Sequence, residues 1–204
     1  SSLDTSKIAP GYTQAYNAIK NALTAQETNL ITPQMVSQIP YASSLISIGK
    51  GPQGLMILES HENGQNTWVT ADGVYLIIEK GKIIQTSGLN NNITRMLRPQ
   101  SLRDSFLLDI TNTTYKYYYS YDFPFLSNLE VKARYTTKDK KTIQLFNQVK
   151  DLTLIQEELS NSFIGWKVLN SYWVDEDFFV WKSEQYISPR LPKITYEITK
   201  KPSK

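Results

Sequence analysis

The stretch of the chain that decides the fold class runs from Thr67 to Thr86 and reads TWVTADGVYLIIEKGKIIQT. In it, short apolar runs alternate with two glycine-containing pairs, Asp72-Gly73 and Lys80-Gly81. Glycine accepts the positive φ that a tight hairpin turn requires, so such pairs between apolar runs predict antiparallel hairpins. The stretch therefore predicts three successive strands of a β-meander.

The segments just before this stretch extend the same pattern. Short strands are expected at 45–48 and 54–59, with a glycine- and proline-rich turn between them. A polar turn at Asn63-Gly64 then leads into the strand that begins at Thr67. Residues 44–87 are thus predicted to form one antiparallel meander.

The N-terminal part has a different character. Residues 1–11 are mostly polar and are expected to be a tether, ahead of a single β-rich domain at 12–204. Apolar residues at helical spacing over 12–23 predict a helix. Thr32, followed by Pro33, predicts the cap and first residue of another short helical turn.

The C-terminal half is predicted to be a second β region, after an irregular segment at 90–105. Turn residues recur between its apolar runs at spacings typical of all-β folds. We therefore expect a mainly β protein, in which a large antiparallel meander sheet folds on itself as a half-barrel or sandwich. The strands expected in this half are 106–110, 113–123, 129–137, 142–150, 152–159, 166–174, 178–186 and 193–199.

Composition excludes several classes of site. The 204 residues carry a net charge of only +3, with basic and acidic residues interspersed, which argues against nucleic-acid binding. No cysteine and one histidine, His61, leave no thiol nucleophile and no cysteine-based zinc site. His61 lies in a polar segment expected to be an exposed turn. We expect no catalytic residue, cofactor or metal site, and interpret the acidic run at 175–177 as a solvated turn rather than a calcium site.

Two groups of residues are candidates for contact with a glycan or a partner protein. Tyrosines at every second position share one face of the strand at 113–123. They either form an exposed platform that stacks on sugar rings or pack into the core, and strand propensity favours the core. Arg95, Arg98 and Arg103 could contact an anionic polymer. The candidates are Tyr115, Tyr117, Tyr119, Tyr121, Arg95, Arg98 and Arg103.

Four segments, in order along the chain, carry a family resemblance: 39–43, 67–74, 81–92 and 170–175. Together they resemble the YjbF/GfcB-type (YmcC-like) outer-membrane lipoproteins, which are encoded with exopolysaccharide and group 4 capsule genes. The segment at 105–150 matches this pattern least. The residues that carry the resemblance most distinctly are Pro40, Trp68, Asp72, Gly73, Gly81, Gly88, Leu89, Trp173 and Asp175.

The resemblance implies a location and a set of partners. It implies a lipid-modified cysteine as the first mature residue, and the start at Ser1 fits a chain cut just after that position. It also implies a domain anchored in the outer membrane and facing the periplasm, with no known catalytic residues. The implied partners are other polysaccharide-export envelope proteins, including an outer-membrane β-barrel, and the polysaccharide itself.

Three functional hypotheses follow. The first is a non-enzymatic accessory or assembly component of capsule or exopolysaccharide secretion. The second is a periplasmic carrier that holds a lipid or other hydrophobic ligand in a sheet-lined cavity, a fold-level analogy. The third, with the least support, is a glycan-acting enzyme that uses a pair of carboxylates among Asp104, Asp109 and Asp122.

Overall fold

The computed structural model describes residues 30–99 and 113–203, and they form one antiparallel sheet of twelve strands. The strand order is β5-β4-β3-β2-β1-β12-β11-β10-β9-β8-β7-β6. This confirms a mainly β fold built as a large meander. The strands are β1 (Ser43–Ile48), β2 (Gly54–Glu62), β3 (Gln65–Thr70), β4 (Tyr75–Glu79), β5 (Lys82–Ser87), β6 (Ile93–Leu97), β7 (Thr114–Tyr121), β8 (Leu126–Gln144), β9 (Val149–Asn161), β10 (Trp166–Val174), β11 (Val180–Gln185) and β12 (Ile194–Lys200).

The N-terminal meander has the expected arrangement. Strands β1 to β5 each pair with the next in antiparallel register, and the predicted turns separate them. Gly73 and Gly81 adopt φ values of 92° and 85°, the conformation for which glycine was inferred at these turns. The hairpin chemistry of the sequence thus predicted this half of the sheet correctly.

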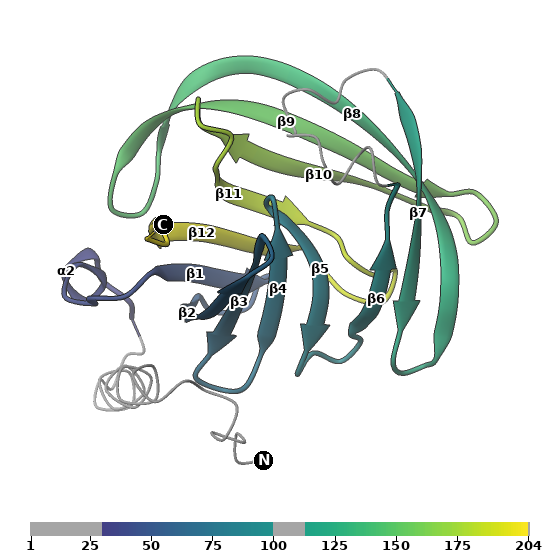
Figure 1. The fold of residues 1–204 in the computed structure, drawn as a ribbon, viewed down its shortest axis with the longest axis horizontal. Coiled ribbons are helices and arrows are strands. Elements are labelled where there is room, and N and C mark those ends of the chain that lie inside the picture. Colours follow the sequence, from purple (N-terminus) through teal and green to yellow (C-terminus); the bar gives the residue numbers. More distant parts are fainter. Residues whose placement is uncertain (1–29, 100–112, 204) are drawn as a thin grey trace.

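The short helix α2 (Pro33–Ser37) also lies where the sequence placed it. Thr32 is its N-cap, and the Thr32 hydroxyl accepts a hydrogen bond of 3.3 Å from the Met35 amide. Val36 packs with Leu45 and Leu55 in a small apolar cluster on the outer surface of β1 and β2. The helix therefore covers one patch of the outer face of the sheet (Figure 1).

Two predictions for the second half were wrong. The sequence pattern predicted an irregular segment at 90–105, but Ile93–Leu97 forms β6 and pairs with β7. It also predicted separate strands at 129–137, 142–150 and 152–159, whereas β8 runs unbroken from Leu126 to Gln144 and β9 from Val149 to Asn161. The turn between them falls at 145–148, within the strand predicted at 142–150. A register shift between Thr137 and Lys140 accommodates the charged residues at 138–141 within the strand.

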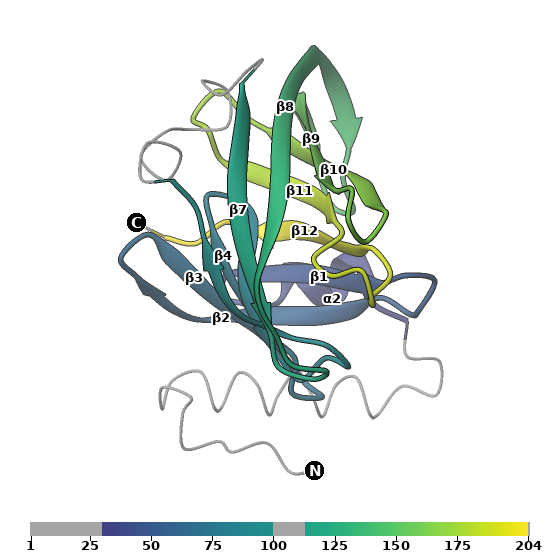
Figure 2. The same ribbon diagram turned by 90° about the vertical axis from the view of Figure 1, so that its right-hand side faces the viewer.

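The sheet curls until its two edge strands meet. β5 and β6 are the first and last strands of the order and lie beside each other, joined by the connection at 88–92 (Figures 1 and 2). The Thr86 hydroxyl accepts a hydrogen bond of 3.0 Å from the Ile93 amide and donates one of 3.2 Å to the Asn92 side chain. The result is a near-closed, barrel-like sheet, which settles the choice between half-barrel and sandwich.

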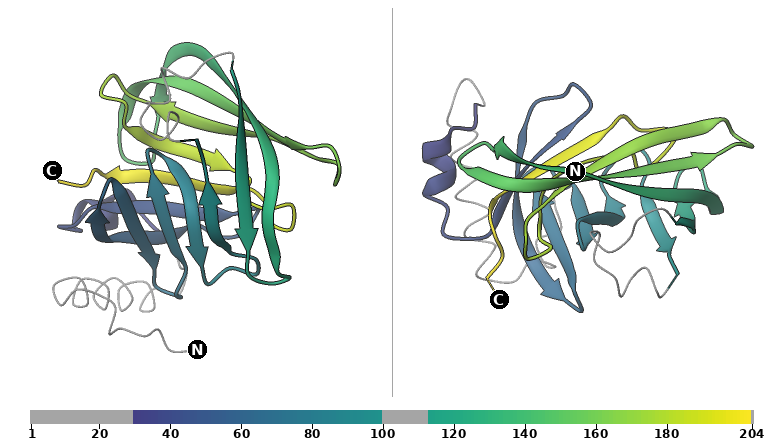
Figure 3. Two further views of the ribbon diagram at one scale, coloured as in Figure 1. Left: turned by 45° about the vertical axis from the view of Figure 1, so that its right-hand side comes forward. Right: turned by 90° about the horizontal axis from the view of Figure 1, so that it is seen from above.

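Antiparallel order fixes which connections share an end of this barrel. The β7–β8 and β9–β10 turns lie at the same end, because β8 and β9 are antiparallel neighbours. The β9–β10 hairpin reaches beyond the strands around it (Figures 1 and 3). The helix α2 and the C-terminal end of β12 lie at the opposite end (Figure 1).

Inward-facing side chains from every strand of the sheet form one hydrophobic core inside the curl. It holds many aliphatic residues and Trp68, and also an unusual number of buried tyrosines, from β7, β8, β10 and β12. The predicted helix at 12–23, the tether at 1–11, the strand at 106–110, and Arg103, Asp104 and Asp109 lie outside the described residues.

Candidate functional site

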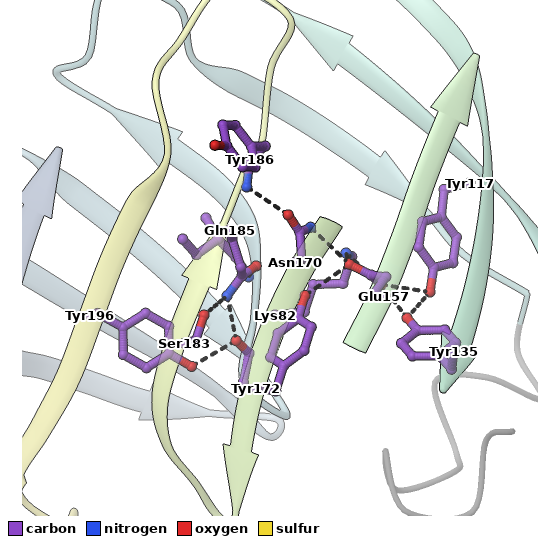
Figure 4. Close-up of polar contacts among 12 residues, drawn as sticks. Lys82, Tyr117, Tyr135, Glu157, Asn170, Tyr172, Ser183, Gln185, Tyr186 and Tyr196 are labelled. Carbon is purple, nitrogen blue, oxygen red and sulfur yellow. Dashed lines mark hydrogen bonds and ion pairs between the residues drawn. The ribbon is translucent and has the colours of Figure 1, made fainter. Parts of the chain in front are cut away.

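The inside of the barrel contains a buried ion pair that joins opposite walls. Lys82 on β5 donates hydrogen bonds of 2.8 and 3.0 Å to the two carboxylate oxygens of Glu157 on β9. Glu157 is 0% exposed and Lys82 is 2% exposed. The two strands are far apart in the sheet order, so the contact crosses the interior (Figure 4).

Neutral donors complete the surroundings of the Glu157 carboxylate. The Asn170 amide and the Tyr172 hydroxyl on β10 donate to Oε1 at 3.0 and 2.9 Å. The Tyr117 hydroxyl on β7 donates to Oε2 at 3.3 Å, and the Tyr135 hydroxyl on β8 donates to the same oxygen. A carboxylate offers about four lone-pair directions, so its capacity to accept hydrogen bonds is fully used.

The pKa of Glu157 reflects these contacts. Burial alone would raise it, but the Lys82 ammonium and the hydrogen bonds from Lys82, Tyr135 and Asn170 hold the pKa of the carboxyl below its ordinary value. Burial lowers the pKa of Lys82, and the nearby carboxylate opposes that shift. Burial, followed by the Glu157 charge, raises the pKa of Tyr117, Tyr135 and Tyr172 well above 10.0. These phenols are therefore neutral donors to a charged acceptor.

A second set of hydrogen bonds ties the β4–β5 turn to β11 and β12. The carbonyl of Gly81 accepts bonds of 2.8 Å from the Gln185 amide and 2.7 Å from the Tyr196 hydroxyl. The Gln185 side-chain oxygen accepts a bond of 3.0 Å from the Ile83 amide (Figure 4). This polar cluster thus clamps the wall made by β4 and β5 to the wall made by β7 to β12. A substrate cannot reach it, so its role is to hold the barrel.

The sequence did not single out this cluster. Glu157 lies between Ile155 and Leu159 at period two, which puts a carboxylate on an apolar strand face and was the available signal. Lys82, Asn170 and Tyr172 lie in two of the four segments that carried the family resemblance. The partner of Glu157 on β5 could not be found this way, because the contact depends on how the sheet closes.

The tyrosine row faces the inside of the barrel. Tyr117, Tyr119 and Tyr121 are exposed by 0%, 1% and 2%, so the exposed sugar-stacking platform is wrong for these three and the core interpretation holds. Tyr119 stacks on Tyr121 with ring centroids 6.1 Å apart. Tyr115 is half-buried and meets Tyr135 edge-to-face at 6.2 Å. The burial follows from the alternation of β7, whose other face is the solvent side.

The arginines lie in different settings. Arg95 on β6 is exposed, with a hydrogen bond of 3.5 Å to the Asn128 side chain, and contact with a ligand there stays a prediction. The Arg98 side chain is largely buried and forms an ion pair with Glu79. The Arg98 guanidinium is therefore not available to an anionic polymer, because it is already paired with Glu79 inside the fold.

The residues that carried the resemblance most distinctly act in turns and in the core. A Cβ on Gly88 would lie 2.3 Å from the Gly73 carbonyl oxygen, so these two turns pack directly together. A Cβ on Gly81 would lie equally close to Val180. The Asp72 carboxylate accepts a hydrogen bond of 2.5 Å from Thr70 within its turn.

The other members of that set are structural as well. Trp68 is in the core, and Trp173 and Leu89 pack against it. Pro40 offers its carbonyl to Lys200 at 3.2 Å, which joins the chain before β1 to the end of β12. The Asp175 carboxylate caps the β10–β11 turn through the amides of Asp177 and Phe179, both at 2.9 Å. The acidic run is thus a hydrogen-bonded turn, as expected.

Other residues of interest are on the surface. His61 is exposed as predicted, but it lies within β2 opposite Asn66 of β3, so its placement in the turn was wrong. Asp122 accepts bonds from the backbone and side-chain nitrogens of Asn92, both at 2.8 Å, and so fixes the β7–β8 turn to the β5–β6 connection. Within the described ranges, no helix is long and apolar enough to span a membrane.

The outer face of β7 to β10 carries a set of residues that the sequence analysis did not identify. An open pocket of about 490 Å³ lies there, at the base of the β9–β10 hairpin. Phe163 at the tip of this hairpin is 97% exposed. The pocket is lined by Glu130, Lys132, Ser160, Asn161, Ser162, Phe163, Gly165, Trp166 and Lys167.

Comparison with known proteins places this chain among envelope lipoproteins. The family model described as group 4 capsule polysaccharide lipoprotein GfcB, YjbF matches residues 16–199. The uncharacterized lipoprotein YjbF of Escherichia coli K12 is 22% identical over 160 residues, which cover 77% of this chain and 74% of YjbF. The uncharacterized lipoprotein GfcB of the same strain is 22% identical over 148 residues, covering 71% of this chain and 69% of GfcB.

A solved structure shares the fold. The crystal structure of the hypothetical lipoprotein YmcC from Escherichia coli K12 superposes with a TM-score of 0.76 at 18% sequence identity. The match covers 93% of this chain and 96% of YmcC. The family match spans nearly the whole sequence and includes both walls that the buried cluster joins. The chain therefore belongs to the YjbF/GfcB family of group 4 capsule polysaccharide lipoproteins.

Proposed function

We propose that this protein is a non-enzymatic accessory or assembly component of capsule or exopolysaccharide secretion. It acts as a lipoprotein of the outer membrane, with the barrel-like domain facing the periplasm. The observation that carries the proposal is the family match over residues 16–199, whose description names a group 4 capsule polysaccharide lipoprotein. In this role the domain binds the polymer, a neighbouring export protein, or both.

The interior of the barrel favours this role over that of a hydrophobic-ligand carrier. A carrier needs an apolar cavity of several hundred Å³ enclosed by the sheet. Core side chains from all twelve strands converge inside the curl, and the ion pair of Lys82 and Glu157 crosses it. A lipid chain entering there would have to displace buried charges and leave them without their partners, at high cost in free energy.

The same interior argues against a catalytic role for its carboxylate. Glu157 accepts hydrogen bonds from five side chains and has no exposed surface. A general acid or base must reach a proton of the substrate. Asp122, one of the three aspartates considered for glycosidase chemistry, holds Asn92 and its own turn together. The surface of the domain is therefore where its function is to be sought.

Gene deletion in the producing bacterium tests the proposal. We expect surface polysaccharide to fall severalfold, while the lipid-linked repeat unit is still made, because the defect lies in secretion. The wild-type gene should restore the polymer. Polysaccharide secretion unchanged by the deletion would refute the role.

Location and chemistry need separate measurements. Density-gradient fractionation should find the full-length protein with outer-membrane markers, and labelled palmitate should be incorporated into it. Purified polymer incubated with the protein should keep its chain length. Recovery in the cytosol would contradict the envelope location, and shortened polymer would contradict the non-enzymatic role.

A further inference from the structure

Three lysines form a row across the outer face of the barrel. Cross-strand register places Lys116 of β7 directly opposite Lys132 of β8. Lys132 is in turn opposite Ser160 of β9, and Ser160 is opposite Lys167 of β10. Direct register partners share one face of a sheet, and neighbouring strands are about 4.8 Å apart. The three lysines therefore lie on one line perpendicular to the strands, on the face turned away from the core.

This row is electrostatically unfavourable for the fold. Like charges directly opposite each other in an antiparallel pair destabilise it. Glu130 lies 3.8 Å from Lys116, and Glu158 lies 3.5 Å from Lys167, so each outer lysine has a carboxylate near it. Lys132, in the middle, has no hydrogen bond or ion pair with any residue that the structure describes. Arg134, two residues from Lys132 on the same face, lies opposite Glu158 and adds a further positive charge. Cations therefore outnumber carboxylates around Lys132.

The surplus charge lies at a pocket. Lys132 and Lys167 both line the open volume of about 490 Å³, together with Ser160, Asn161 and Glu130. The exposed ring of Phe163 borders the same volume. The Asn161 amide is already bonded to the Glu130 carbonyl and the Ile164 amide, at 2.7 and 3.2 Å. A hydroxyl and a carboxylate are thus gathered with an aromatic ring and an unpaired ammonium. Charge, hydrogen-bonding groups and a ring in one concave place suit a ligand that is polar, cyclic and anionic.

We propose that this pocket binds an acidic saccharide of the uronate class. Its carboxylate pairs with Lys132, its ring lies against Phe163, and its hydroxyls bond to Ser160 and Glu130. The proposal rests on the proposed function and specifies it, because it names the polymer chemistry and the face that meets it. Binding removes the repulsion between Lys132 and its neighbours, so part of the affinity comes from relief of a cost present in the free protein.

Calorimetric titration of the purified protein with hexagalacturonate tests the site, with maltohexaose as the uncharged comparison. We expect heat from the uronate oligomer and much less from the neutral one. Lys132→Gln should weaken uronate binding about tenfold or more, the usual effect of losing a hydrogen bond to a charged group. Higher salt should weaken wild-type binding, because the pair is solvent-accessible.

Lys138→Gln is the matched control. Lys138 is an exposed lysine on the same strand, outside the pocket, so its loss removes the same charge without touching the site. Phe163→Ser should reduce binding and leave its salt dependence unchanged, which separates the ring contact from the charge contact. Equal loss in Lys132→Gln and Lys138→Gln would overturn the site, since only the overall charge would then matter.

Further outcomes separate this inference from the proposed function. Equal binding of neutral and acidic oligomers, or none of either, would overturn the uronate site while leaving the secretion defect of the deletion strain as its own result. Binding of phosphatidylglycerol vesicles in place of the oligomer, lost in Lys132→Gln, would reassign the pocket to lipid headgroups and overturn it too. An unchanged secretion phenotype with uronate binding intact would refute the proposed function alone.

Discussion

The inner and outer faces of β7 to β10 differ in how their charged side chains are paired. On the inner face, the Glu157 carboxylate accepts hydrogen bonds from Lys82, two of them, and from four neutral side chains. On the outer face, only a few residues away, Lys132 has no partner in the described residues and faces another lysine. Inside, the charges of Lys82 and Glu157 are matched, whereas outside, Lys116 and Lys132 lie directly opposite each other.

The difference follows from solvent. An unpaired charge in the interior costs several kcal/mol, so a fold that keeps one must satisfy it completely. At the surface, water and salt screen the repulsion between lysines to a fraction of that cost. The inner charges are therefore determined by the requirements of folding. The outer charges are not constrained in this way and are free to serve binding.

The largest expected effect is on the inner face at alkaline pH. Six buried tyrosines have folded-state pKa values raised above 10.0, burial being the first cause in each: Tyr117, Tyr119, Tyr121, Tyr135, Tyr172 and Tyr196. Above pH 10.0 the unfolded chain releases these protons while the folded chain retains them. Stability that is fully present below that pH is therefore lost as pH rises, by about 1.4 kcal/mol per tyrosine and pH unit.

Tyrosinate absorbance and circular dichroism, followed together in an alkaline titration, check this expectation. The absorbance of the buried tyrosines should rise in one cooperative step, at the same pH at which the native dichroism disappears. Ionisation of all tyrosines while the sheet signal stays native would show that the phenols are reached without unfolding.

Breaking the ion pair should give the next largest effect. Glu157→Gln keeps the shape of the side chain but leaves the Lys82 ammonium buried without a counter-charge. We expect the free energy of unfolding to fall by about 3–5 kcal/mol. Urea denaturation measures it, and the variant should also lose the part of the acid sensitivity that comes from protonating Glu157 below its ordinary pKa.

Glu184→Gln provides the control for this substitution. Glu184 pairs with Lys193 at 2.8 Å, but both side chains are partly exposed. Its loss should cost no more than about 1 kcal/mol, the upper end for surface pairs. Similar losses from both substitutions would show that burial does not set the strength of the inner pair.

Removing a single phenol hydroxyl should have an intermediate effect. Tyr172→Phe deletes the 2.9 Å hydrogen bond to Glu157 and leaves the ring in the core. The expected cost is about 1.5–3 kcal/mol, as for hydrogen bonds to charged groups. Tyr118→Phe, whose hydroxyl lies 3.5 Å from Glu130 on the outer face, should change stability by less than about 0.5 kcal/mol in the same urea experiment. Equal costs would contradict the contrast between the faces.

Whether a feature of the fold could be predicted from the sequence depends on how far apart along the chain the interacting residues lie. The turns at Gly73 and Gly81 and the cap at Thr32 are local, so residue types alone placed β1 to β5 and α2 correctly. Strand β6 was missed because Asn90 to Asn92 have the composition of a loop, whereas its pairing partner is β7, across residues 100–112. The continuity of β8 was missed because Lys138 to Lys141 are charged, and only the register shift against β9 keeps them in a strand.

The sites show the same division. Alternation along β7 was enough to group Tyr117, Tyr119 and Tyr121 on one face, but not to say that this face is the inside of a barrel. The pair of Lys82 and Glu157 needs the sheet to close before the residues meet. The lysine row needs three strand registers to be known together. None of these is encoded within one segment, so a reading of local patterns cannot reach them.

The smallest expected effect has the opposite sign and lies on the outer face. Lys132→Thr removes the central charge of the row and introduces a residue that suits a strand, while the ion pairs of Lys116 and Lys167 stay in place. Relief of the repulsion should raise the free energy of unfolding by a few tenths of a kcal/mol, at most about 1 kcal/mol.

The salt dependence of the free energy of unfolding shows whether the stabilisation by Lys132→Thr comes from relieved repulsion. The stabilisation measured by urea denaturation should be largest in dilute buffer and should shrink as salt screens the row, while Lys138→Thr should show no such dependence. A loss of more than about 1 kcal/mol in Lys132→Thr would mean that the lysine supports the fold. A protein that gains stability when Lys132 is removed, yet loses uronate binding, keeps that lysine for its ligand: the fold then tolerates on its outer face the same kind of unpaired charge that its inner face excludes.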